Sequence, residues 1–139
     1  MKRGPRNVFG GRAWCLNALS YDAVMRVLFT PLGLNYGFLY SAILLVRPSR
    51  LVVVTSKQAL VNLHSAVDAA RFFHSVFEVE THLLDDPLSG FGEGRRMARL
   101  LAASAEDDNV VNLTGGTTAI QDCVRSVADV LRVRQQKVR

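Results

Sequence analysis

From residue 25 onward, short apolar runs alternate with longer stretches of helical periodicity. Runs rich in β-branched and other large apolar residues predict four buried or half-buried strands, at residues 26–30, 51–55, 76–84 and 110–113. Apolar residues that recur every three or four positions predict four helices, at residues 35–46, 60–73, 95–104 and 118–134. Four strands alternating with four helices indicate an α/β fold, a Rossmann-like, doubly wound and mostly parallel sheet.

The same periodicity predicts which side chains of three helices face inward. They are Leu60, Leu63, Val67, Ala70 and Phe73 in the second helix, Met97, Leu100 and Leu101 in the third, and Ile120, Cys123, Val124, Val127, Val130 and Leu131 in the fourth. In the third strand, Phe77, Val79 and Thr81 fall on one face, and Glu78, Glu80 and His82 fall on the other. Pro87 and three glycines predict that residues 85–94 form a loop.

The first 24 residues do not fit this alternation, which predicts two regions. Residues 1–24 form a basic N-terminal arm with a small apolar patch around Trp14 and Leu16, and residues 25–139 form one Rossmann-like domain. Met25 stands directly before the first strand and could be the genuine start, in which case the arm is not part of the native protein.

The net charge of +5 first suggests a nucleic-acid binder, but its distribution argues against a broad basic face. Residues 1–26 carry five basic residues against one acidic, and residues 125–139 have the same balance. Between them, seven basic residues face ten acidic ones. We therefore expect no direct binding to long DNA or RNA.

Several function classes lack support in the sequence. Two cysteines, Cys15 and Cys123, do not make a disulfide framework, and the longest apolar stretch, 38–46, is too short to span a membrane. The N-terminus has no signal-peptide core, so a cytoplasmic location is expected. The three histidines lack metal-ligand spacing, and no nucleophile with its base is legible, so no metal, cofactor or catalytic residue is predicted.

The richest chemistry lies where the fourth strand runs into the last helix. The run Asn112-Leu113-Thr114-Gly115-Gly116-Thr117-Thr118 joins a glycine turn, three hydroxyls and the unpaired N–H groups of a helix start. Such a turn lets a phosphate or ribose approach the backbone closely. The alternative is a plain strand-to-helix turn, with glycines for the bend and Thr117 or Thr118 as the N-cap.

The first strand ends in a second glycine loop, Thr30-Pro31-Leu32-Gly33-Leu34-Asn35. If the first and fourth strands are central neighbours, the two glycine loops face each other at the carboxyl edge of the sheet, where such folds bind ligands. Thr55 and Ser56 end the second strand at the same edge, although Ser56 is also suited to cap the next helix. Neither loop is a dinucleotide-binding or Walker motif. Asp85 and Asp86 are expected in a solvated loop.

The run from Asn112 to Thr117 resembles the N-x-T-G-G-T-K motif of CRISPR-associated Rossmann-fold (CARF) sensor domains. The strand exits at 29–33 and 54–56 look like that family's other two signatures, in the right order. The resemblance implies cyclic tetra- or hexa-adenylate as the ligand, bound across a homodimer in type III CRISPR antiviral signalling. It carries over as ligand-binding residues Gly33, Thr55, Asn112, Thr114, Gly115, Gly116 and Thr117, with Leu32, Asn35, Ser56 and Thr118 beside them.

The sequence departs from the family in two respects. Thr118 stands where the family has a lysine, which removes a cation that would face phosphate. The later strands and the effector domain of larger family members do not follow the fourth helix. Two alternatives to a sensor stay open at this point. One is a metal-independent ring nuclease that cleaves the cyclic oligoadenylate, and the other is an unrelated nucleotide-binding Rossmann-like domain.

Overall fold

Four parallel strands in the order β4-β3-β2-β5 form the central sheet of the protein, which we analysed as a computed structural model. The structure describes residues 25–138, with side chains to residue 132, so the arm predicted at residues 1–24 lies outside the described residues. The strands are β2 (Arg26–Pro31), β3 (Arg50–Thr55), β4 (Glu78–Leu83) and β5 (Asp108–Val111). The helices are α1 (Gly37–Val46), α2 (Leu60–Ala70), α3 (Phe91–Leu101), the 3₁₀ turn η2 (Ala102–Ser104) and α4 (Thr118–Val138).

The two central strands are buried on both faces, which explains their continuous apolar sequence. Leu28 in β2 lies opposite Leu51 in β3 and Val110 in β5, so the first and fourth strands of the described sheet are direct neighbours. Five of the six residues of both β2 and β3 are buried. The predicted Rossmann-like fold is confirmed. The two strands that lead into the glycine loops, β2 and β5, are neighbours, with β5 at the edge of the described sheet.

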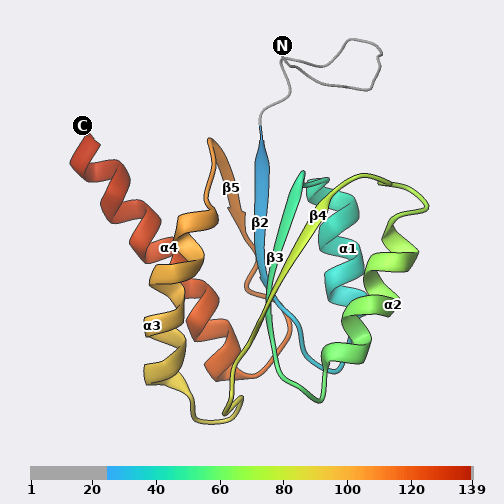
Figure 1. Ribbon diagram of the computed structural model, residues 1–139, viewed down its shortest axis with the longest axis horizontal. Coiled ribbons are helices and arrows are strands. Elements are labelled where there is room, and N and C mark those ends of the chain that lie inside the picture. Colours follow the sequence, from blue (N-terminus) through green and yellow to red (C-terminus); the bar gives the residue numbers. More distant parts are fainter. Residues whose placement is uncertain (1–24, 139) are drawn as a thin grey trace.

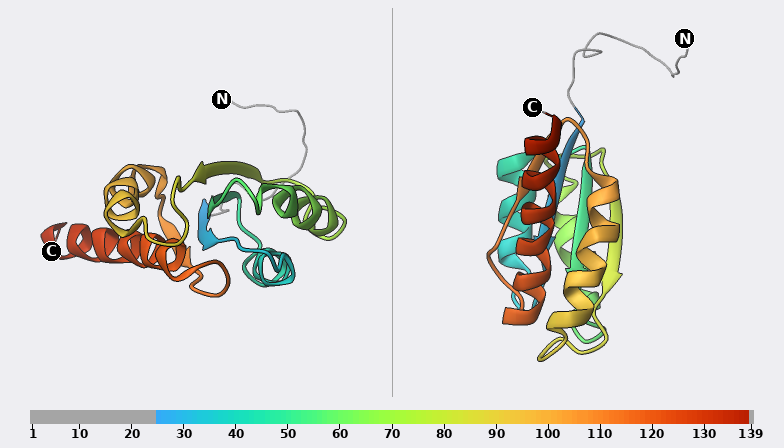
Figure 2. Two further views of the ribbon diagram at one scale, coloured as in Figure 1. Left: turned by 90° about the horizontal axis from the view of Figure 1, so that it is seen from below. Right: turned by 90° about the vertical axis from the view of Figure 1, so that its left-hand side faces the viewer.

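Helices cover both faces of the sheet, as a doubly wound fold requires. Figures 1 and 2 show α3 and α4 on one side of the strands and α1 and α2 on the other. Alternate strand residues separate accordingly. Val27 and Phe29 pack with α3 and α4, whereas Leu28 packs with α1 and α2. Each face therefore has its own apolar core, and the loops that leave the carboxyl ends of the strands meet at one edge.

The third helix differs from the sequence prediction at both its start and its inward face. It begins at Phe91, inside the predicted loop, and Leu100 is 74% exposed where an inward position was expected. The inner face is formed by Gly94, Ala98 and Leu101, which are buried. A Cβ on Gly94 would lie 3.0 Å from the Cβ of Cys123, so small residues allow α3 and α4 to pack closely. The predicted inward positions of α4 are buried or partly buried in the same core.

Helix α2 and strand β5 also differ from prediction, and α1 and β4 are shorter by one or two residues at their ends. Helix α2 ends at Ala70, and Phe73 is 64% exposed in the turn that follows, so its expected inward position is wrong. Strand β5 begins at Asp108, earlier than predicted, where Asp108 lies opposite Arg26 of β2 and their side chains pair at 2.7 Å. None of the helices within residues 25–138 has the length and apolar character needed to cross a membrane.

Candidate functional site

The loops that follow β2 and β5 touch each other at the carboxyl edge of the sheet. A Cβ built on Gly33 would lie 2.8 Å from both the Cα and the amide nitrogen of Gly116, so no other residue fits at Gly33 without a backbone shift. Gly115 and Gly116 have φ values of 96° and 75°, a left-handed conformation that favours glycine. Three glycines are thus needed for this contact between the loops.

Side chains from neighbouring elements hold the β2–α1 loop in place. The Thr55 hydroxyl donates to the carbonyl oxygen of Leu32 at 2.9 Å, and both residues are buried. The amide of Asn62 in α2 donates to the carbonyl oxygens of Gly33 and Leu34, at 3.3 and 3.1 Å. Thr55 and Asn62 are therefore positioning residues that hold the β2–α1 loop in place through its carbonyl oxygens.

Hydrogen bonds within the β5–α4 loop and to neighbouring segments hold this loop in place. The Asn112 amide nitrogen donates to the buried Thr30 hydroxyl at 3.0 Å, and its oxygen accepts from the Thr114 backbone amide at 3.2 Å. The Thr117 hydroxyl donates to the Pro87 carbonyl and accepts from the Ile120 backbone amide at 3.3 Å, which makes Thr117 the cap of α4. Of the two candidate caps that the sequence offers, Thr117 and Thr118, the structure shows Thr117 in this role.

A pocket of about 500 Å³ opens where the two loops meet. Within the described residues, its lining contains no charged side chain. It is formed by Gly33, Leu34, Asn35, Phe38, Ser56, Ala59, Gly115, Gly116, Thr117, Ile120 and Gln121. No described residue accepts a hydrogen bond from the backbone amides of Gly115, Gly116 or Thr117. These amides lie just before the 21-residue helix α4, and the N-terminus of a helix favours a bound anion.

The structure places the predicted site residues at four kinds of position. Six of them line the pocket: Gly33, Asn35, Ser56, Gly115, Gly116 and Thr117. Leu32 and Thr55 are buried beneath it. Asn112 and Thr114 line a neighbouring groove of about 340 Å³ between β5 and α1, and Thr118 is exposed at the first position of α4.

Sequence reasoning missed several residues of this site. Phe38 and Gln121 line the pocket from the first turns of α1 and α4, and Asn62 supports it from α2. The first turn of a helix that follows a glycine loop faces the carboxyl edge of the sheet, and that position is the signal that could have identified Phe38 and Gln121. Asn62 has no such local signal because its contacts are to residues that lie 28 and 29 positions away.

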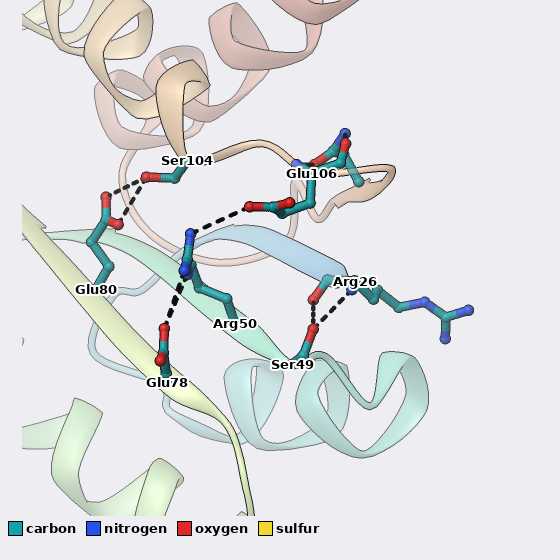
Figure 3. Close-up of polar contacts among 8 residues, drawn as sticks. Arg26, Ser49, Arg50, Glu78, Glu80, Ser104 and Glu106 are labelled. Atoms are coloured by element: carbon teal, nitrogen blue, oxygen red, sulfur yellow. Dashed lines mark hydrogen bonds and ion pairs between the residues drawn. The ribbon is translucent and has the colours of Figure 1, made fainter. Parts of the chain in front are cut away.

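A second polar cluster lies toward the amino ends of the strands (Figure 3). Arg50 contacts Glu78 at 3.2 Å and Glu106 at 4.0 Å, and the Ser104 hydroxyl donates to Glu80 at 2.8 Å. Burial raises the pKa of Glu80, but hydrogen bonds from His82 and Ser104, with the charges of His82 and Arg50, outweigh it and hold that pKa below its usual value. These groups contact one another, so the cluster joins β3, β4 and η2 and offers no open site.

Cys123, the cysteine among the described residues, is also unsuited to act as a nucleophile. Cys123 is fully buried, and burial, followed by the negative charges of Asp122 and Glu93, raises the pKa of its thiol to about 12. A thiol in this environment stays protonated and cannot act as a nucleophile at neutral pH. Over residues 25–138, no group of three or more His, Cys, Asp and Glu side chains is arranged to hold a metal ion.

Comparison with known proteins gives a fold-level likeness. No family model matches the sequence, and no curated protein matches it. Among solved structures, the chain is similar to Can2 from Sulfobacillus thermosulfidooxidans in complex with cyclic tetra-adenylate, with a TM-score of 0.60 and 15% sequence identity. The match covers 77% of this chain and 29% of that chain, so this chain spans less than a third of Can2. The described residues therefore share a Rossmann-like fold with part of Can2.

Proposed function

We propose that this chain binds a cyclic oligoadenylate in the pocket between its two glycine loops, as a sensor domain of type III CRISPR antiviral signalling. The observation that carries the proposal is the T-G-G-T turn: Gly115, Gly116 and Thr117 line a pocket at the start of α4, and their backbone amides have no acceptor among the described residues. The likeness in fold to a protein that was solved with cyclic tetra-adenylate supports the same ligand class.

The chemistry of the pocket suits a ring of phosphodiesters and riboses. Backbone amides at a helix start bind phosphate oxygens without a charged side chain. The Ser56 hydroxyl accepts from the Ala59 backbone amide at 3.3 Å, so its own hydrogen is free to donate to a ribose or phosphate oxygen. Apolar residues such as Leu34 and Ile120 complete the wall. The pocket can therefore bind both the polar backbone and the bases of such a ligand.

The size of the pocket argues for binding across a homodimer. Its volume of about 500 Å³ lies within the range of roughly 300–1,000 Å³ that accommodates one drug-sized molecule. A ring of four or six nucleotides is larger than that, so one protomer would hold only part of it. A symmetric ring meets the same patch twice when two copies are related by a two-fold axis. Leu34, 80% exposed beside the pocket, supplies apolar surface for that contact.

Isothermal titration with cyclic tetra-adenylate and cyclic hexa-adenylate tests the proposal. We expect one ring to bind per two chains. Gly116→Val should abolish binding because a side chain there lies 3.2 Å from the Pro31 Cβ and fills the turn. Ser56→Ala provides a milder change that should weaken binding, and Gly92→Ala, on the exposed face of α3, should leave it unchanged.

Circular dichroism establishes that each variant is folded before the titration. If folded wild-type protein gives no heat with either ring, the proposed function is wrong. Chromatography of the same samples after long incubation separates a sensor from the ring nuclease alternative. A sensor returns the intact ring, whereas a ring nuclease leaves linear products that end in a 2′,3′-cyclic phosphate.

A further inference from the structure

An aromatic side chain stands at the mouth of the pocket with about half of its surface exposed. Phe38, in the first turn of α1, lines the pocket and is 47% exposed. Its ring lies against the glycine turn, because a Cβ on Gly115 would be 3.5 Å from the Phe38 Cδ2 atom. Contact with the turn fixes one part of the ring and leaves the rest open. A planar aromatic surface of this kind is a stacking platform for a base.

Gln121 presents a hydrogen-bond acceptor at the same pocket. Its amide nitrogen donates to the Gly115 carbonyl oxygen at 2.9 Å and reaches the Gly116 carbonyl oxygen at 3.5 Å. Two carbonyl contacts require the nitrogen of the amide to face the turn, so the Oε1 atom is directed away from it. No described residue donates a hydrogen bond to that oxygen.

Asn35 provides the complementary donor from the opposite loop. Its side-chain oxygen accepts from the Gly37 backbone amide at 2.9 Å, and its amide nitrogen has no acceptor among the described residues. The pocket lining thus holds one oriented acceptor and one oriented donor beside an exposed ring. Adenine offers an amino donor next to a ring-nitrogen acceptor, whereas guanine offers a carbonyl oxygen where adenine has its amino group.

We infer that Phe38, Gln121 and Asn35 form a subsite for an adenine base within this pocket, which we call the adenine seat. This inference rests on the proposed function. The base stacks on the Phe38 ring, its amino group donates to Gln121 Oε1, and its ring nitrogen accepts from the Asn35 amide. The phosphates then face the backbone amides of the glycine turn. Specificity for adenine comes from these neutral side chains, and the affinity for phosphate comes from the backbone.

Titrations with matched ligands and matched variants test the adenine seat. Cyclic tetra-inosinate has a carbonyl oxygen in place of the amino group, and we expect it to bind wild-type protein at least tenfold more weakly than cyclic tetra-adenylate. Phe38→Leu keeps an apolar contact with Gly115 but removes the aromatic face, and should weaken binding of cyclic tetra-adenylate by about tenfold or more. Phe38→Trp should retain binding, because it keeps a stacking surface.

The outcomes separate this inference from the proposed function. If wild-type protein binds cyclic tetra-adenylate and cyclic tetra-inosinate equally, or if Phe38→Leu binds as wild type does, the adenine seat is wrong and the binding function stands. If wild-type protein binds neither adenylate ring, the proposed function fails and the seat fails with it. The inosinate comparison uses unaltered protein, so a folding defect in a variant cannot decide the result. Sedimentation of the free Phe38→Leu protein shows whether lost affinity reflects lost association of the chains.

Discussion

At the scale of single residues, the contact between Gly33 and Gly116 is the tightest constraint on the candidate site. We predict that Gly33→Ala lowers the free energy of unfolding by about 1–3 kcal/mol, because its Cβ would meet the backbone of Gly116 at 2.8 Å. Urea unfolding followed by circular dichroism measures the change. The β2–α1 and β5–α4 loops would have to separate to admit the methyl group, so the variant should also lose ligand affinity.

Gly92→Ala is the matched control for that change. Gly92 lies within α3 and is exposed, and its Cβ would meet only the end of the Arg96 side chain, at 3.5 Å. Alanine is the better helix former by about 0.5–1 kcal/mol, so this variant should be as stable as wild type or more stable. Equal destabilisation by both variants would contradict the importance of the loop contact.

The thiol of Cys123 gives a second test at this scale. We predict that it reacts slowly with a thiol reagent at pH 8 in the folded chain, because it is fully buried and its pKa is raised to about 12. In a Cys15→Ser background, absorbance of the released chromophore reports Cys123 alone. Guanidinium should restore fast, complete labelling. Rapid labelling without denaturant would show that α3 and α4 open readily at Gly94.

At the scale of elements, the sequence predicted what depends on local pattern and missed what depends on packing between elements. β2 and β3 were predictable because strands buried on both faces are apolar throughout. The start of α3 was missed because its first turn contains glycines that are typical of loops. Gly94 lies within α3 and packs against Cys123 of α4, and no window of sequence around Gly94 contains that contact.

The residues of the candidate site also divide into those that the local sequence predicts and those that depend on packing between elements. The glycines and threonines of the T-G-G-T turn form one continuous run, so their position was predictable from the residues and from the family resemblance. Asn62 and Gln121 were not predicted, because each donates to the carbonyl oxygens of a loop and any amide side chain can do so. The fold alone decides which amides are near enough.

The link between β4 and η2 predicts a pH-dependent contribution to stability. The Glu80 carboxylate accepts from the Ser104 hydroxyl at 2.8 and 3.0 Å, and its pKa is lowered from the usual 4.5. A carboxyl group whose pKa is lowered by folding stabilises the fold above its unfolded pKa, and the effect is lost as the pH falls through the folded value. Ser104→Ala should therefore cost about 1 kcal/mol at pH 7.

Urea unfolding of wild type and Ser104→Ala at pH 7 and at several values below 4.5 measures this contribution. The difference between the two proteins should shrink as Glu80 becomes protonated. Ser65→Ala is a suitable control, because Ser65 is exposed in α2 and has no hydrogen bond from its side chain in the described structure. A difference for Ser104→Ala that stays constant with pH would show that the serine acts through packing alone.

At the scale of the whole molecule, the distribution of charge and the location of the pocket are separate. β2 begins and α4 ends at the edge of the sheet opposite the two glycine loops (Figure 1). The net charge of +5 comes from basic residues near the two ends of the sequence, whereas the pocket lining within the described residues holds no charge. A phosphate-bearing ligand in this pocket would therefore be held by backbone amides and neutral side chains.

This arrangement predicts a weak salt dependence for the binding of cyclic tetra-adenylate. Each phosphate that is neutralised by a basic side chain contributes about −0.7 to the slope of log affinity against log salt for single strands. For wild-type protein, the magnitude of this slope should be smaller than the value expected for one phosphate paired with a basic side chain. Thr118→Lys, at the exposed first position of α4, should increase affinity and steepen the slope by about one contact. Titrations between low and high sodium chloride measure both.

Thr118→Gln separates charge from side-chain length, and it should leave the wild-type slope unchanged. A lysine at a helix start opposes the helix dipole and should cost about 0.3–1 kcal/mol of stability without ligand, so the lysine variant should gain affinity while it loses stability. A steep wild-type slope would mean that basic residues outside the pocket lining reach the ligand. The basic ends would then belong to the site, and the backbone amides of the T-G-G-T turn would not be the main source of its positive potential.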